Sequence, residues 1–347
     1  MKHDWEYKKL GEICDKGSSN ISLNKIEDNI GEYALFGASG YVKGIDFYHN
    51  ENPYIGIVKD GSGCGRVNIY PAKSSLVGTM QYIYPKQNCD IKFLMYLLQS
   101  LDLSSLVTGA AIPHIYFKDY SKFSIPVPPL PTQQSIVSEL DSLSKIIADC
   151  KVTLKDYDAL EQSIFYDMFG DPVKNDKGWE VKKIEDVYSL KAGKTIKANE
   201  LSEEPSEGLY PCFGGNGIRG YIAKKSHCGS YPIIGRQGAL CGNVNFAEGE
   251  FYATEHAVVV SNKIECNPLF SYFLLTNMKL ERLAKGVAQP GLSVASVNEE
   301  NSILPPLPLQ QQFASKIEAI EKMKSETKKA LQEAETLFNA RMDYWFN

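Results

Sequence analysis

Two glycine-dense segments of this 347-residue chain carry side chains that could recognise nucleotide bases. One reads DGSGCGRV from residue 60, directly after Lys59, and the other reads RQGALCGNV from residue 236. Glycine lets a backbone approach a ligand closely. Arg can pair with two atoms of guanine, and Asn or Gln with two atoms of adenine, in the major groove of DNA. Neither segment has the GxxxxGK[ST] spacing that holds nucleotide phosphates, so a plain turn and a DNA-facing loop are the two interpretations.

The candidate DNA contacts are the basic and amide side chains in and near these segments. Two of them follow a repeated Phe-Gly turn, and two lie at a repeated GxAxP segment. Taken alone, such a residue is more often a solvated surface residue than a base contact. The full set is Lys43, Lys59, Arg66, His114, Arg219, Arg236, Gln237, Asn243 and Gln289.

The second half of the chain repeats the first at an offset of 177 residues. Identical residues recur without a gap, for example Gly61 with Gly238, Cys64 with Cys241, and Pro113 with Pro290. The segment PPLPTQQ from residue 128 likewise matches PPLPLQQ from residue 305. This period is too long for a solenoid repeat of about 20–50 residues, so each copy is expected to be a domain.

The matched glycine segments differ in the side chains that could contact bases. Lys59 corresponds to Arg236, and Arg66 corresponds to Asn243. Different side chains on one scaffold are what two different DNA half-sites would require.

Two kinds of element are expected to position these residues. Short β-branched and aromatic runs alternate with glycine clusters, which is typical of strands and tight turns. One helix per copy is expected around IKFLMYLLQS from residue 91 and NPLFSYFLLTN from residue 267. The predicted class is α+β, with two β-rich mixed domains related by a pseudo-two-fold repeat.

A long helix is expected after each PPLP segment, because apolar residues then recur every three to four positions. The alternative is that each helix packs on its own domain; we favour an antiparallel pair that forms a coiled-coil spacer. Lys324 and Arg341 interrupt the second stripe. The first stripe runs through Ile136, Leu140, Leu143, Ile147, Cys150, Leu154, Tyr157, Leu160, Ile164 and Met168.

These patterns divide the chain into four parts. The expected boundaries are 1–131 for the first domain, 132–169 for the central helix, 170–308 for the second domain and 309–347 for the C-terminal helix.

Composition limits the class of protein. The hydrophobic fraction of 43% supports packed cores, and no segment predicts a membrane span or a signal peptide, so we expect a cytoplasmic protein. The net charge of -5 disfavours binding of DNA by bulk electrostatics. The eight cysteines form no CxxC pair, so the sequence does not indicate a metal site of that type. We also find no catalytic constellation in the sequence.

Several segments together resemble the specificity subunit of type I restriction-modification systems. They are IPVPPLPTQQSIV, ILPPLPLQQQFASKI and MFGDPVKNDKGWEVKKI. The C-terminal DYWFN also matches DMFGD at the end of the first helix, which fits the circular organisation of that family.

The resemblance implies a non-catalytic protein without a cofactor that reads a bipartite, asymmetric site in double-stranded DNA. Each domain would read one half-site, and the helices would set the spacer. Two methyltransferase subunits and the translocating restriction subunits would be its partners. Those partners would also supply phosphate contacts that this acidic chain lacks.

Two alternatives come from other classes. A self-contained adenine methyltransferase is suggested by FGGNG from residue 213 and NPLF from residue 267. Both segments are weak, because the first copy of the repeat has FGASG and the second segment lacks the second proline of the NPPY type. The other alternative is a coiled-coil scaffold that does not bind DNA.

Overall fold

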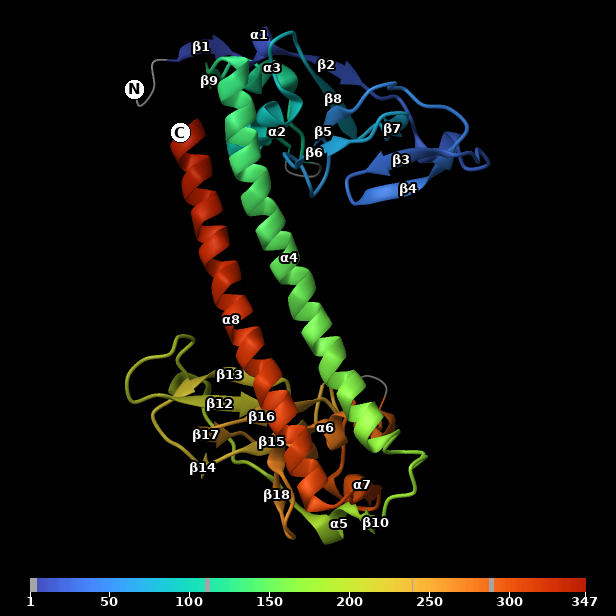
Figure 1. The fold of residues 1–347 in the computed structure, drawn as a ribbon, viewed down its shortest axis with the longest axis vertical. Helices are drawn as coiled ribbons and strands as arrows, with labels where there is room; N and C mark the ends of the chain where they lie inside the picture. The colour runs from blue at the N-terminus through green and yellow to red at the C-terminus, as the bar shows by residue number, and fades with distance from the viewer. Residues whose placement is uncertain (1–4, 110–112, 239, 287–289) are drawn as a thin grey trace. The chain divides into compact units, whose positions relative to one another are not determined.

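The computed structural model describes residues 5–109, 113–238, 240–286 and 290–347 (Figure 1). The chain forms two compact units. The first comprises Met1–Lys151 together with Lys328–Asn347, and the second comprises Val152–Thr327. Each unit therefore combines one copy of the repeat with parts of both long helices.

The first unit is rich in short strands. Its elements in chain order are β1 (Glu6–Lys9), α1 (Leu10–Ile13), β2 (Cys14–Ser18), η1 (Leu23–Lys25), β3 (Tyr33–Gly37), β4 (Gly40–Ile45), β5 (Tyr54–Val58), β6 (Val67–Tyr70), β7 (Ser74–Leu76), β8 (Met80–Pro85), α2 (Ile91–Ser100), η2 (Leu103–Leu106), α3 (Phe117–Tyr120) and β9 (Ser124–Val127). The long helix α4 (Leu130–Phe169) follows.

The second unit repeats this order with one additional strand, β14. Its elements are β10 (Val181–Lys183), α5 (Ile184–Val187), β11 (Tyr188–Ala192), η3 (Ala198–Glu200), β12 (Tyr210–Gly214), β13 (Gly217–Ile222), β14 (His227–Cys228), β15 (Tyr231–Gly235), β16 (Val244–Ala247), β17 (Glu250–Ala253), β18 (Ala257–Asn262), α6 (Pro268–Asn277), η4 (Leu280–Leu283), α7 (Val294–Asn298) and β19 (Asn301–Ile303). The second long helix is α8 (Leu307–Phe346).

The sheets of the two units have the same topology. Antiparallel sheets β2-β8-β5-β6 and β11-β18-β15-β16 correspond, and β4-β3-β7 corresponds to β13-β12-β17-β14, which has one additional strand. The pairs β3–β7 and β12–β17 are parallel. Even the register shift between Leu35 and Phe36 recurs between Cys212 and Phe213. The predicted repeat and the α+β class are therefore confirmed.

The short helices α2 and α6 begin in the same way and pack on these sheets. The side chain of Asp90 accepts hydrogen bonds from the first amides of α2, and that of Asn267 does so for α6. Such caps stabilise a helix by about 1 kcal/mol. The apolar face of α2, including Phe93, Leu94 and Leu97, is buried, so both predicted helices are confirmed.

Each long helix begins at its PPLP segment because a glutamine there fixes it to the domain. The Gln133 side chain accepts the amide of Asp90 at 2.8 Å and donates to the Pro128 carbonyl at 2.9 Å. Gln310 makes the matching bonds to Asn267 and Pro305, at 3.0 and 2.8 Å. The predicted helix starts thus depend on tertiary contacts as well as on proline.

The long helices run antiparallel within each unit. In the first unit Glu139, near the start of α4, binds Arg341 near the end of α8. In the second unit Glu161, near the end of α4, binds Lys324 in the first half of α8. The predicted antiparallel pair is therefore confirmed.

The apolar stripe differs in part from the expectation. Leu160 was expected in it but is 43% exposed, whereas Phe165 and Phe169 are fully buried. The reason is that this end of α4 packs on its domain, with Phe169 at 4.8 Å from the ring of Phe270. The helices thus bury residues both against each other and against the domains, so the two packing alternatives hold together.

The end of α8 takes the same place in the first unit that the end of α4 takes in the second. Phe346, which matches Phe169, packs on Phe93 with ring centroids 5.5 Å apart. Trp345 stacks on Trp5 at 5.9 Å. The circular organisation suggested by the DYWFN segment therefore exists inside the first unit. In the described part of the chain no helix is long and apolar enough to cross a membrane.

Candidate nucleic-acid interface

The two glycine segments fold into loops of the same shape. The first glycine loop, residues 59–66, joins β5 to β6, and the second, residues 236–243, joins β15 to β16. The Gly65 amide donates to Val58 O at 2.9 Å, and the Gly242 amide donates to Gly235 O at 2.8 Å. The amides of Cys64 and Cys241 reach Gly61 O and Gly238 O, both at 3.0 Å.

Glycine is required at the corners of both loops. Gly61 and Gly65 have φ of +91°, and Gly238 and Gly242 have φ of +94° and +93°. Residues other than glycine rarely adopt this backbone conformation. The glycines therefore fix one backbone shape and leave the side chains between them free to differ.

The repeated GxAxP segments hold the loops in place. The Gly61 amide donates to Pro113 O at 2.9 Å, and the Gly238 amide donates to Pro290 O at 3.0 Å. The backbone of Thr108 also pairs with that of His114. Residues 110–112 and 287–289 lie outside the described part of the chain, and the candidate Gln289 is among them.

Asp60 connects two candidates of the first loop. Lys59 Nζ lies 2.5 Å from Asp60 Oδ2, and His114 Nδ1 contacts Asp60 Oδ1. The His114 ring also packs on Tyr116 at 4.1 Å. Between 21% and 25% of each of the three linked side chains is exposed. These groups therefore form one positioned, partly exposed cluster, and its acidic member was not among the candidates chosen from the sequence.

Arg66 and Asn243 occupy the matched last position of each loop, and both are exposed. Arg66 Nε donates to Gly63 O at 3.3 Å, and among the described residues no carboxylate pairs with it. A guanidinium that is held only by a weak backbone bond can be redirected to a base or a phosphate.

The second loop places Arg236 and Gln237 without an acidic neighbour in the loop. The Arg236 amide donates to His256 O at 3.1 Å, and its carbonyl accepts the Leu292 amide at 2.8 Å. The Arg236 side chain is half-buried and that of Gln237 is exposed. Gln237 stands where the first loop has Asp60, so the second loop offers an amide instead of a carboxylate.

Arg219 and His256 line a hollow of about 480 Å³ beside the second loop. Its other walls are the glycine turn of residues 214–217 and Ile218. A Cβ at Gly215 would lie 3.2 Å from Gln237 O and 3.4 Å from His256 O, so the turn touches the loop. The structure thus brings Arg219, Gln237 and His256 to one edge of the second unit.

His256 was missed in the sequence, although the repeat contains a signal for it. It matches Thr79, whose carbonyl accepts the Lys59 amide at 3.0 Å. A histidine at the matched place is a divergence between the copies of the kind that marks the loop residues. Tyr41 and Ile218 were also missed; they occupy matched positions after the Phe-Gly turns and are 66% and 54% exposed.

Lys43 is bound to a segment other than the first loop. Its ammonium donates to Ile26 O at 3.0 Å and to Glu27 O at 2.8 Å. These bonds hold the segment of residues 26–27 to β4, which is a structural role.

The two segments that suggested a methyltransferase have other functions in the fold. FGGNG is the turn of the β12–β13 hairpin, so no helix follows it as a nucleotide-binding unit requires. In NPLF, Asn267 caps α6 by accepting the amides of Leu269 and Phe270 at 2.9 and 3.1 Å. One segment is therefore a β-turn and the other a helix cap.

A comparison with protein families gives one match that covers most of the chain. A model described as the type I restriction modification DNA specificity domain matches residues 2–156 and again residues 176–336. The two matches correspond to the two copies of the repeat.

Curated proteins and solved structures agree with this match. The chain is 37% identical over 240 residues to the type I restriction enzyme EcoprrI specificity subunit of Escherichia coli, covering 65% of this chain and 60% of that protein. It is 23% identical over 276 residues to the MjaIX specificity subunit of Methanocaldococcus jannaschii, covering 69% of this chain and 64% of the relative. The chain thus spans less than two thirds of these relatives.

Among solved structures, the S subunit of a type I restriction-modification system from M. genitalium has the same fold. The TM-score is 0.72 at 17% identity, covering 99% of this chain and 96% of that one. A chain from a structure of the assembly and conformational transition of the type I R-M system gives 0.57 at 16% identity, with 98% and 96% covered.

Proposed function

The chain belongs to the family of type I restriction modification DNA specificity domains, and from this we propose that it reads a bipartite, asymmetric DNA sequence for a modification and restriction complex. Each unit reads one half-site with its glycine loop and the residues around it. The chain itself performs no chemistry and binds no cofactor.

One observation carries this proposal most strongly. The two glycine loops have matching hydrogen bonds and matching positive φ angles, yet their polar side chains differ at each matched candidate position. Loops that share a backbone but carry different side-chain donors and acceptors can recognise two different base sequences.

We propose that the first unit reads with Lys59, Arg66 and His114. The second unit reads with Arg219, Arg236, Gln237, Asn243 and the additional His256. Lys43 and Gln289 remain candidate contacts of the first and the second copy of the repeat, and Gln289 lies outside the described residues. We also propose that residues 1–131 and 170–308 are the two DNA-reading domains and that residues 132–169 and 309–347 are the spacer helices.

Partners of the chain follow from its family and its charge. A net charge of -5 means that Asp and Glu outnumber Lys and Arg, so the chain has no overall excess of positive charge for phosphates. We propose that two methyltransferase subunits and the restriction subunits bind this chain in the cytoplasm and supply those contacts. The antiparallel helices set the distance between the half-sites.

Sequencing of methylated adenines tests the division of labour in cells that carry the matching methyltransferase. Asn243→Ala should relax one position in one half-site about 10- to 100-fold, and Arg66→Ala should relax the other half-site, because a bidentate base contact discriminates by about 1–3 kcal/mol. If deleting the gene leaves every methylated motif unchanged, the proposal fails.

The helices are tested by removing one facing heptad from each, residues 148–154 and 329–335. At 1.5 Å per residue the spacer helices shorten by about 10 Å, or about three base pairs of DNA. Both half-sites should stay the same while the gap between them shrinks. Loss of one half-site instead would contradict a spacer role.

A further inference from the structure

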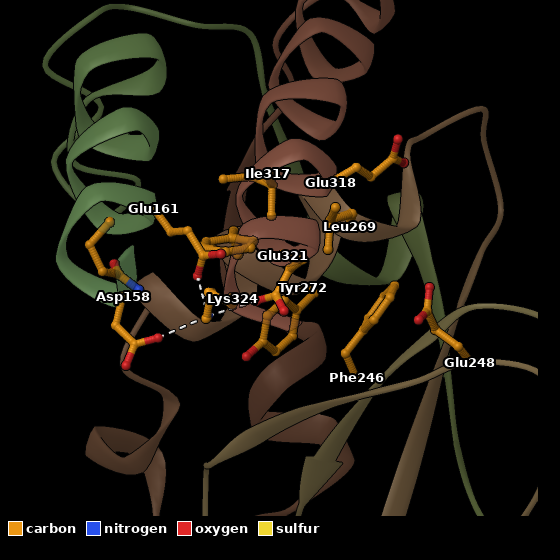
Figure 2. Close-up of a pocket in the computed structure, with 12 residues that line it drawn as sticks. Asp158, Glu161, Phe246, Glu248, Leu269, Tyr272, Ile317, Glu318, Glu321 and Lys324 are labelled. Carbon is orange, nitrogen blue, oxygen red and sulfur yellow. Dashed lines mark hydrogen bonds and ion pairs between the residues drawn. The ribbon is translucent and has the colours of Figure 1, made fainter. Parts of the chain in front are cut away.

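The second unit contains a cavity of about 580 Å³ that the proposed function does not use. It lies where α4, α8 and α6 meet the turn between β16 and β17 (Figure 2). This volume is within the range of small-molecule sites. Its walls are apolar in part, formed by Phe246, Leu269, Tyr272, Phe273 and Ile317.

The polar lining of the cavity is strongly acidic. Among the described residues that line the cavity, Lys324 is the only cation, and it already binds Asp158 at 2.8 Å, Glu161 at 3.1 Å and Glu321 at 2.7 Å. Two further carboxylates, Glu248 and Glu318, also line the cavity. In the part of the chain that the structure describes, neither of these two has an ion-pair partner. The cavity therefore has an excess of negative charge.

Glu161 supplies a second and independent indication of a ligand. Its side chain is only 7% exposed, and Oε2 binds Lys324. The other oxygen, Oε1, is buried with no hydrogen-bond donor among the described residues. Burial and the neighbouring carboxylate of Glu321 raise the pKa of this carboxyl even though Lys324 lowers it. An unsatisfied buried acceptor costs about 1–3 kcal/mol, which a donor in the cavity would recover.

The charges and the apolar walls have a clear order. In Figure 2, Asp158, Glu161 and Lys324 lie on one side, and Glu248 and Glu318 lie on the other. The aromatic rings of Phe246 and Tyr272 lie between them, with the side chain of Glu321 beside Tyr272. Ammonium groups separated by methylene chains match this order with opposite charge, and ammonium groups also favour aromatic faces.

In the first unit, a lysine side chain of the protein itself occupies the position that matches part of this cavity. There Lys92, which matches Leu269, binds Asp141 at 2.5 Å. Asp141 in turn matches Glu318. The first unit therefore places an alkylammonium chain on this carboxylate, whereas the second unit has a leucine at that position and leaves the carboxylate without a cation.

The two units also differ at the position of Glu161. Phe338 in the first unit matches Glu161, and its ring packs on Tyr96 at 6.1 Å. Tyr96 also donates a hydrogen bond to Asp141 at 2.8 Å. An aromatic ring thus occupies the matched place in one unit, and a buried carboxylate that lines the cavity occupies it in the other.

We propose that the cavity of the second unit binds a linear aliphatic polyamine. One ammonium group lies between Glu248 and Glu318, the methylene chain lies on Phe246 and Tyr272, and a second ammonium group donates to Glu161. The ligand replaces the lysine that the first unit carries at position 92.

Calorimetric titration of the full chain with spermidine and with putrescine, in the absence of DNA, tests the proposal. We expect saturable binding at one site. Glu318→Gln should weaken it about tenfold, because one charge-assisted bond is lost. Glu326→Gln changes an exposed carboxylate on the same helix and should leave binding unchanged. Glu318 is itself exposed, so its variant is expected to fold.

Leu269→Lys is the sharper variant, because it restores the lysine of the first unit. It should abolish polyamine binding and raise the melting temperature of the unliganded protein. The proposal is overturned if the wild-type chain does not bind spermidine saturably. It is also overturned if Mg²⁺ at equal charge displaces spermidine fully, if Glu326→Gln weakens binding as much as Glu318→Gln, or if Leu269→Lys still binds.

Discussion

The two units share a backbone but differ in how they join the long helices. In the first unit the cation in the apolar stripe of α8 is Arg341, which pairs with Glu139 of α4, and about a third of each side chain is exposed. In the second unit the contact is Glu161 with Lys324, with 7% and 10% exposed. The same sequence feature, a cation in the apolar stripe of α8, is thus a surface pair in one unit and a buried cluster in the other.

This difference shows that the repeat preserves the backbone structure more strictly than the polar side-chain interactions that contribute to stability. The matched glycines, the matched glutamines and the matched phenylalanines make the same contacts in both units. Polar side chains between them have diverged, both in the glycine loops and along the helices. We expect the units to differ in stability and in recognition while they keep one fold.

The largest expected effect is on the aromatic end of the helices. Phe169→Ala should destabilise the second unit by about 3–5 kcal/mol, because Phe169 is fully buried between Phe270 and Phe313. Phe346→Ala should cost the first unit less, because Phe346 is 8% exposed. Guanidinium unfolding of both variants measures the difference; equal losses would contradict it.

The next effect concerns the two polar contacts. Lys324→Met should destabilise by about 3 kcal/mol at pH 8, because Glu161 is left charged and buried. Arg341→Met breaks a partly exposed pair and should cost under about 1 kcal/mol. A similar loss in both variants would show that burial does not separate the two contacts.

The pH dependence sharpens this prediction. The pKa of Glu161 is raised above its usual value of 4.5 by burial. The folded state therefore holds this proton to higher pH than the unfolded state, and stability falls as pH rises from about 4.5 through the raised pKa. Glu161→Gln should remove that fall, and the penalty of Lys324→Met should shrink at pH 5. Unfolding measured at pH 5, 6.5 and 8 tests both statements.

A smaller effect is expected within the second glycine loop. Gly242→Ala should cost about 2–3 kcal/mol, because φ is +93° and the added Cβ would lie 2.4 Å from the Glu281 amide nitrogen. Gly238→Ala has a similar φ but open space around the Cβ, so it should cost about 1 kcal/mol. Melting temperatures measure the order of the two variants, and the reverse order would contradict it.

Much of the architecture followed from the sequence alone. The 177-residue offset established two similar domains, and the PPLP segments located the long helices. These features are local or periodic, so chain chemistry determines them: glycine permits positive φ, proline starts a helix, and apolar spacing of three to four residues marks a helical face.

The placement of side chains across the fold depended on tertiary structure. No periodicity indicated that Glu161 and not Leu160 would be buried, because the end of α4 turns its face toward α6. Likewise, Asp60 holds Lys59 and His114 together, and His256 joins the second loop, only because segments distant in the chain meet there. Burial and pairing between distant residues are set by packing, and a linear pattern carries no record of them.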